Sequence, residues 1–274
     1  MRFLITGANG FVGYHIIHRA LLENHEVIAL KRKKSDSFTF SNHNNLVWKN
    51  FNYENFDELK NEKIDVIIHL AATGISPRQD SWENLIKTNI ELTIKICHFA
   101  KKINKRLICA GSYAEYGLSG LKYDFIPVDA PLEPTFPYAI SKAIASQLAI
   151  SFSKTEKIEL AYLRIFNAFG PRQYEKNLWP SLYKASINKE DFKMTQGDQI
   201  RDFINIEEVA KLFIYIAEIP SKSFVNPFVR NIASGIPQSI FEFSCFHWKK
   251  WNSKGKLLRG AIPYRTNEVM RYVP

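Results

Sequence analysis

The chain has 274 residues, of which 46% are hydrophobic, and it carries a formal net charge of +10. That length suits one domain, or one domain with a smaller lobe, and no stretch reaches the roughly 20 uncharged apolar residues that a membrane-spanning helix needs. The charge favours anionic partners such as nucleotides, nucleic acid or acidic membranes, without choosing among them. Cys97, Cys109 and Cys245 are scattered, so neither a disulfide framework nor a metal site is expected.

The amino-terminal sequence runs from Met1 straight into "FLITGANGF", whose glycines come too soon for a secretion signal. We therefore expect a cytoplasmic protein that does not act on membranes. The basic, aromatic segment at residues 248–256 would suit stacking on bases, but no nucleic-acid module surrounds it. No nucleic-acid partner is predicted.

The first half of the chain alternates strand and helix patterns. Strands are predicted at residues 2–6, 26–30, 65–71 and 106–111, and helices at 11–24, 57–62 and about 82–102. Such alternation is typical of a parallel sheet with helices on both faces. The predicted fold is α/β, a Rossmann-type doubly wound parallel sheet that binds ligands beyond the carboxyl ends of its strands.

After a proline-rich loop, the second half becomes shorter and more mixed. A helix at about 138–154 and a strand at 158–166 are followed by helices near 179–188, 207–219 and from 238, with strands near 201–206 and 229–233. We predict a dinucleotide-binding domain over residues 1–166, with later elements near 203–233 interleaved into it. Residues 167–274 are predicted to form a smaller substrate-binding lobe.

Three glycines lie between the first strand and the first helix, in "TGANGFVG". Glycine there allows a tight turn and lets the backbone and the helix N-terminus approach a pyrophosphate. The spacing Gly-x-x-Gly-x-x-Gly is one residue looser than the standard fingerprint, and an ordinary turn is the alternative, but the position between strand and helix favours a dinucleotide site. Gly7, Gly10, Phe11 and Gly13 are the predicted cofactor-binding residues.

The second strand ends in four cations, Lys31, Arg32, Lys33 and Lys34. A carboxylate at this place would bind both ribose hydroxyls of NAD, whereas a guanidinium or ammonium pairs with the 2′-phosphate of NADP. We predict that Arg32 and Lys31 bind this phosphate, so that NADP(H) is preferred to NAD. For Lys33 and Lys34 a solvated loop is the better interpretation.

Tyr138 and Lys142 are four residues apart at the start of a helix, so their side chains share a face. An ammonium beside a phenol is expected to lower the phenol's pKa from about 10, which suits proton transfer to or from a substrate oxygen. Ser112 follows the strand at 106–111 and can hydrogen-bond the reacting carbonyl. Ser112, Tyr138 and Lys142 are therefore the predicted catalytic residues, and Tyr138 and Lys142 are also expected to contact the cofactor.

With these motifs in this order, the chain resembles the extended short-chain dehydrogenase/reductase family, and within it the enzymes that modify nucleotide sugars. The resemblance extends from Met1 to about Val273. It implies that Leu70, Ala71 and Ala72 in "HLAA" line the cofactor. In the helix that follows, it gives Asn89 a structural role.

The later motifs of the family imply a nucleotide-sugar site. "LRIFNAFGP" places Asn167 near the substrate diphosphate, and "GDQIRDFINIEEVA" offers Arg201 to the diphosphate and Asp202 to orient its segment. "PYRTNEVMRYV" offers Arg265 to the nucleotide, and Glu268 to its ribose or to a neighbouring side chain. A surface ion pair is the alternative for both arginines.

The positions at which this chain differs from the family's motifs reduce the number of candidate reactions. Dehydratases of this family carry an Asp-Glu pair where this chain has Tyr113 and Ala114, and Cys109 lies within an apolar strand, where it is expected to be core. Ketone reduction and 4-epimerisation remain. Because of the strand-end cations, we predict NADPH-dependent reduction of the C4 ketone of a nucleotide-linked 4-keto-6-deoxy sugar. A nucleotide-sugar 4-epimerase is the second hypothesis, and a non-catalytic NADP-binding sensor or scaffold is the third.

Two further expectations rest on the resemblance alone. Family members continue into another helix beyond the region that matches "NEVMRYV", so the small lobe is expected to be abbreviated at its C-terminus. They also dimerise through the helices that here begin near Trp82 and Tyr138, so a homodimer is expected.

Overall fold

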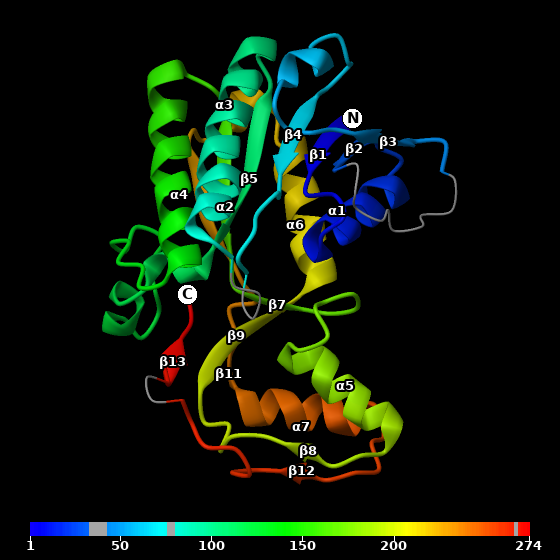
Figure 1. The fold of residues 1–274 in the computed structure, drawn as a ribbon, viewed down its shortest axis with the longest axis vertical. Helices are drawn as coiled ribbons and strands as arrows, with labels where there is room; N and C mark the ends of the chain where they lie inside the picture. The colour runs from blue at the N-terminus through cyan, green and yellow to red at the C-terminus, as the bar shows by residue number, and fades with distance from the viewer. Residues whose placement is uncertain (33–42, 76–79, 266–267) are drawn as a thin grey trace.

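The computed structural model describes residues 1–32, 43–75, 80–265 and 268–274. Its central feature is a seven-stranded sheet in the order β10-β6-β5-β4-β1-β2-β3, with every pair parallel (Figure 1). The strands are β1 (Arg2–Thr6), β2 (Glu26–Lys31), β3 (Leu46–Asn50), β4 (Val66–His69), β5 (Arg106–Ser112), β6 (Leu160–Ile165) and β10 (Phe228–Ile232). The strand order reverses between β1 and β4, and this topology confirms the predicted doubly wound fold.

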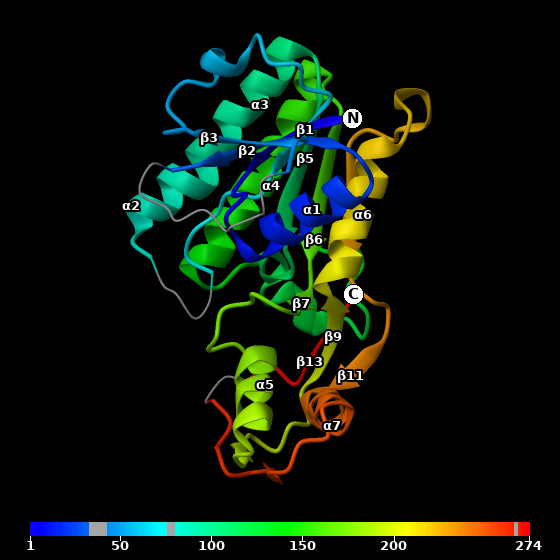
Figure 2. The same cartoon turned by 90° about the vertical axis from the view of Figure 1, so that its right-hand side faces the viewer.

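Helices cover both faces of the sheet (Figures 1 and 2). α1 (Phe11–Leu22) and α6 (Ile206–Glu218) pack on one face, and α3 (Leu92–Ile103) and α4 (Pro137–Glu156) pack on the other. Successive strand residues alternate between the two cores, so Ile5 joins the α1–α6 core and Leu4 the α3–α4 core. Burial on both faces explains why these strands are almost continuously apolar.

The helix predicted at about residues 82–102 contains a local irregularity. It begins as α2 (Trp82–Leu85), continues as a π-helical segment, η2 (Ile86–Glu91), and ends as α3. Such π segments occur frequently at functional sites. Here the segment contains Asn89, which is buried.

The remaining elements gather below the carboxyl ends of the main strands (Figure 1). β9 (Ile200–Asn205) pairs with three short strands, β7 (Asn167–Phe169), β11 (Pro237–Ser239) and β13 (Arg271–Tyr272). α5 (Leu178–Asn188) and α7 (Ile240–Lys250) lie beside one another, next to the small pair β8 (Phe192–Lys193) and β12 (Leu257–Leu258). α6 and β10, although late in the chain, return to the large sheet.

Short 3-10 turns complete the chain: η1 (Phe56–Leu59), η3 (Tyr113–Tyr116), η4 (Ser119–Lys122) and η5 (Ser221–Ser223). η1 takes the place of the helix predicted at 57–62, and β3 was not predicted at all. Among the described residues, no helix is both long enough and apolar enough to cross a bilayer.

Candidate active site

The glycine turn is packed tightly against the segment that follows β4. Gly7 has φ +67°, and a Cβ added to it would lie 2.6 Å from the backbone nitrogen of Ala71. A Cβ on Gly13 would lie 2.5 Å from the carbonyl oxygen of Gly7. At Gly10, the N-cap of α1, a Cβ would meet only the Gly7 carbonyl oxygen, at 3.2 Å. The N-terminus of α1 is therefore open to an anionic group, as a dinucleotide pyrophosphate requires.

Thr6 and His69 connect β1 to β4 at the point where the strand order reverses. The Thr6 hydroxyl accepts hydrogen bonds from the backbone N–H groups of residues 70 and 71, at 3.2 and 3.3 Å, and contacts His69 Nδ1 at 2.7 Å. Burial, with a smaller contribution from the Lys142 ammonium, lowers the pKa of His69 to about 3. His69 is therefore neutral at the rim of the site. Neither residue was predicted to have a role, although a hydroxyl before the glycine turn was a visible signal.

The three predicted catalytic residues lie together at the carboxyl end of β5. Ser112 is the last residue of β5, and its hydroxyl is close enough to the phenol of Tyr138, in the first turn of α4, to influence the pKa of that phenol. Lys142, one turn later, is buried and donates a 2.8 Å hydrogen bond to the carbonyl oxygen of Ala110. The residue spacing along β5 and α4 thus brings a hydroxyl, a phenol and an ammonium to one edge of the sheet.

The pKa of Tyr138 differs from the expectation. Burial raises it, and the hydrogen bond from Ser112 only partly offsets this effect. The Lys142 ammonium is directed to Ala110, and burial lowers its own pKa. Tyr138 therefore keeps its proton in the protein alone, so the predicted lowering of its pKa is wrong for this state.

A buried ion pair supports the segment that carries Ser112. Glu115 is fully buried and pairs with Arg164 on β6 at 2.8 Å. The Glu115 carboxylate also accepts hydrogen bonds from the backbone N–H of Ser112, at 2.8 Å, and from the Tyr162 hydroxyl, at 3.0 Å. Glu115 thereby fixes the turn after β5. The prediction overlooked it, although an acid in the apolar stretch after the catalytic serine was visible.

Asn89 has the structural role that was expected. Its side chain accepts from the backbone N–H of Thr73 at 2.9 Å and donates to the Thr73 carbonyl at 3.1 Å and to the Ser141 hydroxyl at 2.8 Å. The π segment η2 is thus tied to the loop after β4 and to α4, one residue before Lys142. These bonds hold the two elements that flank the cluster.

Cys109 is a buried, unpaired thiol, and burial raises its pKa to about 12. Cys97 and Cys245 are also free, so no disulfide is present. The expectation that Cys109 is a core residue is confirmed.

The residues assigned to the substrate diphosphate lie on β7 and β9. Asn167 donates a 3.1 Å hydrogen bond to the Asp202 carbonyl oxygen. Asp202 is buried, and its carboxylate accepts from the backbone N–H groups of Ser234 and Gly235, at 2.7 and 2.8 Å, so it orients this segment as expected.

Arg201 pairs with Glu268 at 3.4 Å and donates to the Val269 carbonyl at 2.6 Å. Burial lowers the pKa of Arg201, and Tyr113, next to Ser112, is close enough to interact with it electrostatically. Arg201 is therefore near the catalytic turn. Arg265 is exposed, and its carbonyl oxygen accepts a 3.1 Å hydrogen bond from the backbone N–H of Glu268. Glu268 binds a neighbouring side chain, one of the two roles expected of it.

Of the four cations at the end of the second strand, the structure describes Lys31 and Arg32. Lys31 is the last residue of β2, with its ammonium 5.9 Å from the centre of the Trp48 ring, and Arg32 follows it as an exposed residue. Both lie at the carboxyl end of β2, next to the glycine turn at the end of β1. Lys33 and Lys34 lie outside the described residues.

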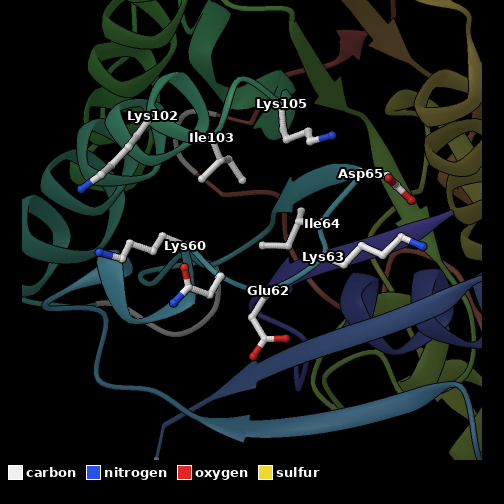
Figure 3. A pocket seen from close by; sticks show the side chains of 9 residues that line it. Lys60, Glu62, Lys63, Ile64, Asp65, Lys102, Ile103 and Lys105 are labelled. Atoms are coloured by element: carbon white, nitrogen blue, oxygen red, sulfur yellow. The ribbon is translucent and has the colours of Figure 1, made fainter.

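A surface groove of about 550 Å³ lies elsewhere, between the segment before β4 and the end of α3 (Figure 3). It is lined by residues 60–65, 102, 103 and 105, and four of these residues are lysines. These residues precede β4 and β5, at the amino ends of the strands. Because parallel sheets bind ligands at the carboxyl ends, this groove is not the dinucleotide site.

Together, the doubly wound sheet, the glycine turn and the Ser112–Tyr138–Lys142 cluster define an enzyme of the extended short-chain dehydrogenase/reductase class. The model of the NAD dependent epimerase/dehydratase family matches residues 3–232. The chain belongs to this family, whose members include nucleotide-sugar 4-epimerases and 4-dehydrogenases.

Individual relatives agree with this assignment. The chain is 31% identical over 257 residues to a protein of Methanocaldococcus jannaschii named "Putative UDP-glucose 4-epimerase", covering 87% of this chain and 79% of the relative. It is 26% identical over 285 residues to dTDP-6-deoxy-L-talose 4-dehydrogenase (NAD(+)) of Aggregatibacter actinomycetemcomitans, covering 98% of both. Among solved structures, UDP-N-acetylglucosamine 4-epimerase from Methanobrevibacter ruminantium M1, in complex with UDP-N-acetylmuramic acid, has a TM-score of 0.85 at 25% identity, covering 99% of this chain and 88% of that one.

The family name and the talose relative both specify NAD. A nicotinamide dinucleotide is thus the cofactor class, and the predicted preference for NADP depends on Lys31 and Arg32 alone.

Proposed function

We propose that this protein reduces the C4 ketone of a nucleotide-linked 4-keto-6-deoxy sugar, with NADPH as the hydride donor. The observation that carries the proposal is that Ser112, a Tyr138 that keeps its proton and the buried Lys142 lie together at the carboxyl end of β5. A protonated phenol can supply the proton that a ketone oxygen takes up on reduction.

Each residue has a separate task in this reaction. Ser112 hydrogen-bonds the ketone oxygen and orients it, and Tyr138 donates the proton to that oxygen. Lys142, whose ammonium is bonded to the Ala110 carbonyl, would bind a ribose hydroxyl of the cofactor and stabilise the tyrosinate that remains. The bound dinucleotide supplies the hydride.

The substrate's diphosphate would bind in the smaller lobe formed by residues 167–274, excluding α6 and β10. Arg201 is the cation nearest the catalytic turn, and binding a diphosphate would require it to exchange its Glu268 contact for phosphate oxygens. Arg265 would approach the nucleotide from the loop before β13, and Asn167 would contact the diphosphate from β7. The chain is proposed to work in the cytoplasm.

The choice of NADPH follows from charge. At the described end of β2 the chain presents Lys31 and Arg32, which would attract a 2′-phosphate where an acid would repel it. An Arg32→Ala variant should lose about tenfold or more in affinity for NADPH and little in affinity for NADH. Equal losses for the two dinucleotides would contradict the proposed role of Arg32.

Steady-state turnover distinguishes the candidate functions. With NADPH and a panel of CDP-, dTDP-, GDP- and UDP-linked 4-keto-6-deoxy sugars, reduction predicts oxidation of one NADPH per sugar converted. A 4-epimerase, which the names of two relatives favour, would interconvert two sugar nucleotides without net NADPH consumption. Tight dinucleotide binding with neither activity would leave a sensor or scaffold.

We also propose that the protein is a dimer through α2 and α4. Trp82 on α2, Ile86 at the start of η2 and Ile144 on α4 are exposed apolar side chains. A shallow groove beside α4 is lined by Leu132, Pro134 and Leu148. An Ile144→Glu variant should elute as a monomer in size-exclusion chromatography with light scattering. A monomeric wild type would exclude this assembly.

A further inference from the structure

Tyr53 holds an unusual backbone conformation beside the dinucleotide site. It follows β3 with φ +63°, in the left-handed region that costs a non-glycine residue of order 1–3 kcal/mol. Its ring packs edge-on against Phe51, with centroids 5.5 Å apart, and against Phe56 at 6.3 Å. The aromatic packing fixes the ring, and the backbone conformation is retained in spite of its cost.

The Tyr53 hydroxyl lies between the ends of β1 and β2. It donates a 3.3 Å hydrogen bond to the carbonyl oxygen of Leu30 on β2, and the backbone N–H of Gly7 is close enough to lower the pKa of the phenol. The last paired residues of the two strands are Ile5 and Ala29. The hydroxyl thus lies one step beyond the β1–β2 ladder, between the glycine turn and the strand end that carries Arg32.

The hydrogen-bonding capacity of this hydroxyl can be counted. A phenol has one proton to donate and two acceptor lone pairs. Burial raises the pKa of Tyr53, so the proton stays on the oxygen, and it is committed to Leu30. The phenol oxygen therefore keeps acceptor capacity for a further donor, at a place where this fold puts the adenosine ribose.

We propose that Tyr53 is a further dinucleotide-binding residue, whose hydroxyl accepts a hydrogen bond from the 3′-hydroxyl of the adenosine ribose. The phenol here replaces part of the strand-end carboxylate that NAD enzymes use, which accepts from both ribose hydroxyls. The inference rests on the proposed function, because it requires that a dinucleotide occupies this site.

Tyr53 and Arg32 therefore have separable roles in dinucleotide binding. Tyr53 has no proton left for the acceptor oxygens of a 2′-phosphate, whereas the 3′-hydroxyl is common to NADH and NADPH. Tyr53 sets the affinity for both dinucleotides, and Arg32, which interacts electrostatically with the same hydroxyl, sets the preference between them.

Calorimetric titration of the full chain with NADPH and with NADH tests this inference. Tyr53→Phe should lower the affinity for both dinucleotides by about five- to tenfold. The ratio of the two affinities should stay within about twofold of the wild-type ratio. Arg32→Ala should change the ratio instead. Tyr272→Phe is the matched control, because its hydroxyl also donates to a backbone carbonyl, that of Gly117 at 3.1 Å, but away from the glycine turn. It should change neither affinity.

A second measurement uses the unaltered protein, so it does not depend on how the variant folds. Wild type should bind ADP about five- to tenfold more tightly than 3′-deoxy-ADP, and Tyr53→Phe should bind the two alike. Equal binding by wild type, or a loss in Tyr53→Phe confined to NADPH, would overturn the role of Tyr53. A wild type that binds neither dinucleotide would overturn the proposed function as well.

Discussion

The ammonium of Lys142 is hydrogen-bonded to the carbonyl oxygen of Ala110 at 2.8 Å, and this bond anchors the lysine to β5. Tyr138, one helical turn earlier, interacts with the Ser112 hydroxyl instead. The two residues on the same face of α4 therefore interact with different groups of β5. This arrangement positions both side chains and leaves the phenol protonated, as its proposed role as proton donor requires.

Removing the Tyr138 hydroxyl should abolish most of the activity. Tyr138→Phe deletes the proton donor and is expected to lower kcat by about 10²- to 10⁴-fold. Its melting temperature and dinucleotide affinity should stay close to those of wild type. Tyr215→Phe, on the exposed face of α6, is the control and should retain full activity. Comparable rates for Tyr138→Phe and wild type would remove Tyr138 from the mechanism.

Alanine substitutions at Gly7 and Gly235 test whether steric contact with neighbouring backbone requires a glycine in the turn after β1. Both have positive φ, +67° and +76°, but a Cβ at Gly7 would lie 2.6 Å from backbone, and at Gly235 nothing lies within 4 Å. Gly235→Ala should cost about 1–2 kcal/mol, the conformational strain alone. Gly7→Ala should cost more and abolish dinucleotide binding. Equal losses of stability in urea denaturation would show that steric contact at Gly7 is unimportant.

Stability should depend on pH through His69. Its pKa is about 3 in the folded protein and about 6.5 when unfolded, so between these values the unfolded chain binds the additional proton. His69 therefore makes its full contribution to the free energy of unfolding above pH 6.5, and this contribution is lost as the pH falls toward 3. Between pH 6.5 and pH 5, protonation of His69 in the unfolded chain should lower the free energy of unfolding by about 2 kcal/mol.

Urea denaturation of wild type and His69→Gln at pH 7 and pH 5 measures this contribution. The variant should lose less stability between the two pH values, whatever its stability at pH 7. Parallel pH dependence in the two proteins would mean that His69 is not the buried neutral group described above.

The Glu115–Arg164 ion pair should be far more costly to disrupt than an exposed pair. Glu115→Gln leaves the guanidinium of Arg164 buried without its counter-charge, and it should destabilise the protein by about 3–5 kcal/mol. Asp198→Asn, which disrupts the exposed 2.5 Å pair with Arg259, should cost less than about 1 kcal/mol. Similar costs in denaturant unfolding would contradict the role assigned to Glu115 in fixing the turn at Ser112.

The long, regular elements of the large sheet could be predicted from sequence because their patterns are strong. β1, β4 and β5 are apolar and bounded by turn residues, and the helices between them are amphipathic. β3 was missed because "LVWKN" is an edge strand with exposed positions and no continuous apolar run. In the second sheet β9 was predicted, near residues 201–206, whereas its partners β7, β11 and β13 have two or three residues each and are too short to give a periodic signal.

At the site, the motifs identified Ser112, Tyr138 and Lys142, whose spacing along β5 and α4 is readable from sequence. The direction of the Lys142 ammonium and the burial of Tyr138 were not readable, because they depend on how β5 and α4 pack. Tyr53 illustrates the same limit. Its positive φ and its hydrogen bond to Leu30 follow from tertiary packing, and tyrosine itself gives no sign of either.

The central claim is that hydride passes from a nicotinamide dinucleotide to C4 of a nucleotide sugar beside Tyr138. The most direct test is to incubate the protein with NADPH deuterated at the transferred position and a nucleotide-linked 4-keto-6-deoxy sugar, and to locate the label by mass spectrometry and NMR. We predict one deuterium at C4 of the product for each NADPH oxidised, and none with Tyr138→Phe. A converted sugar without deuterium, or label at another carbon, would contradict the account.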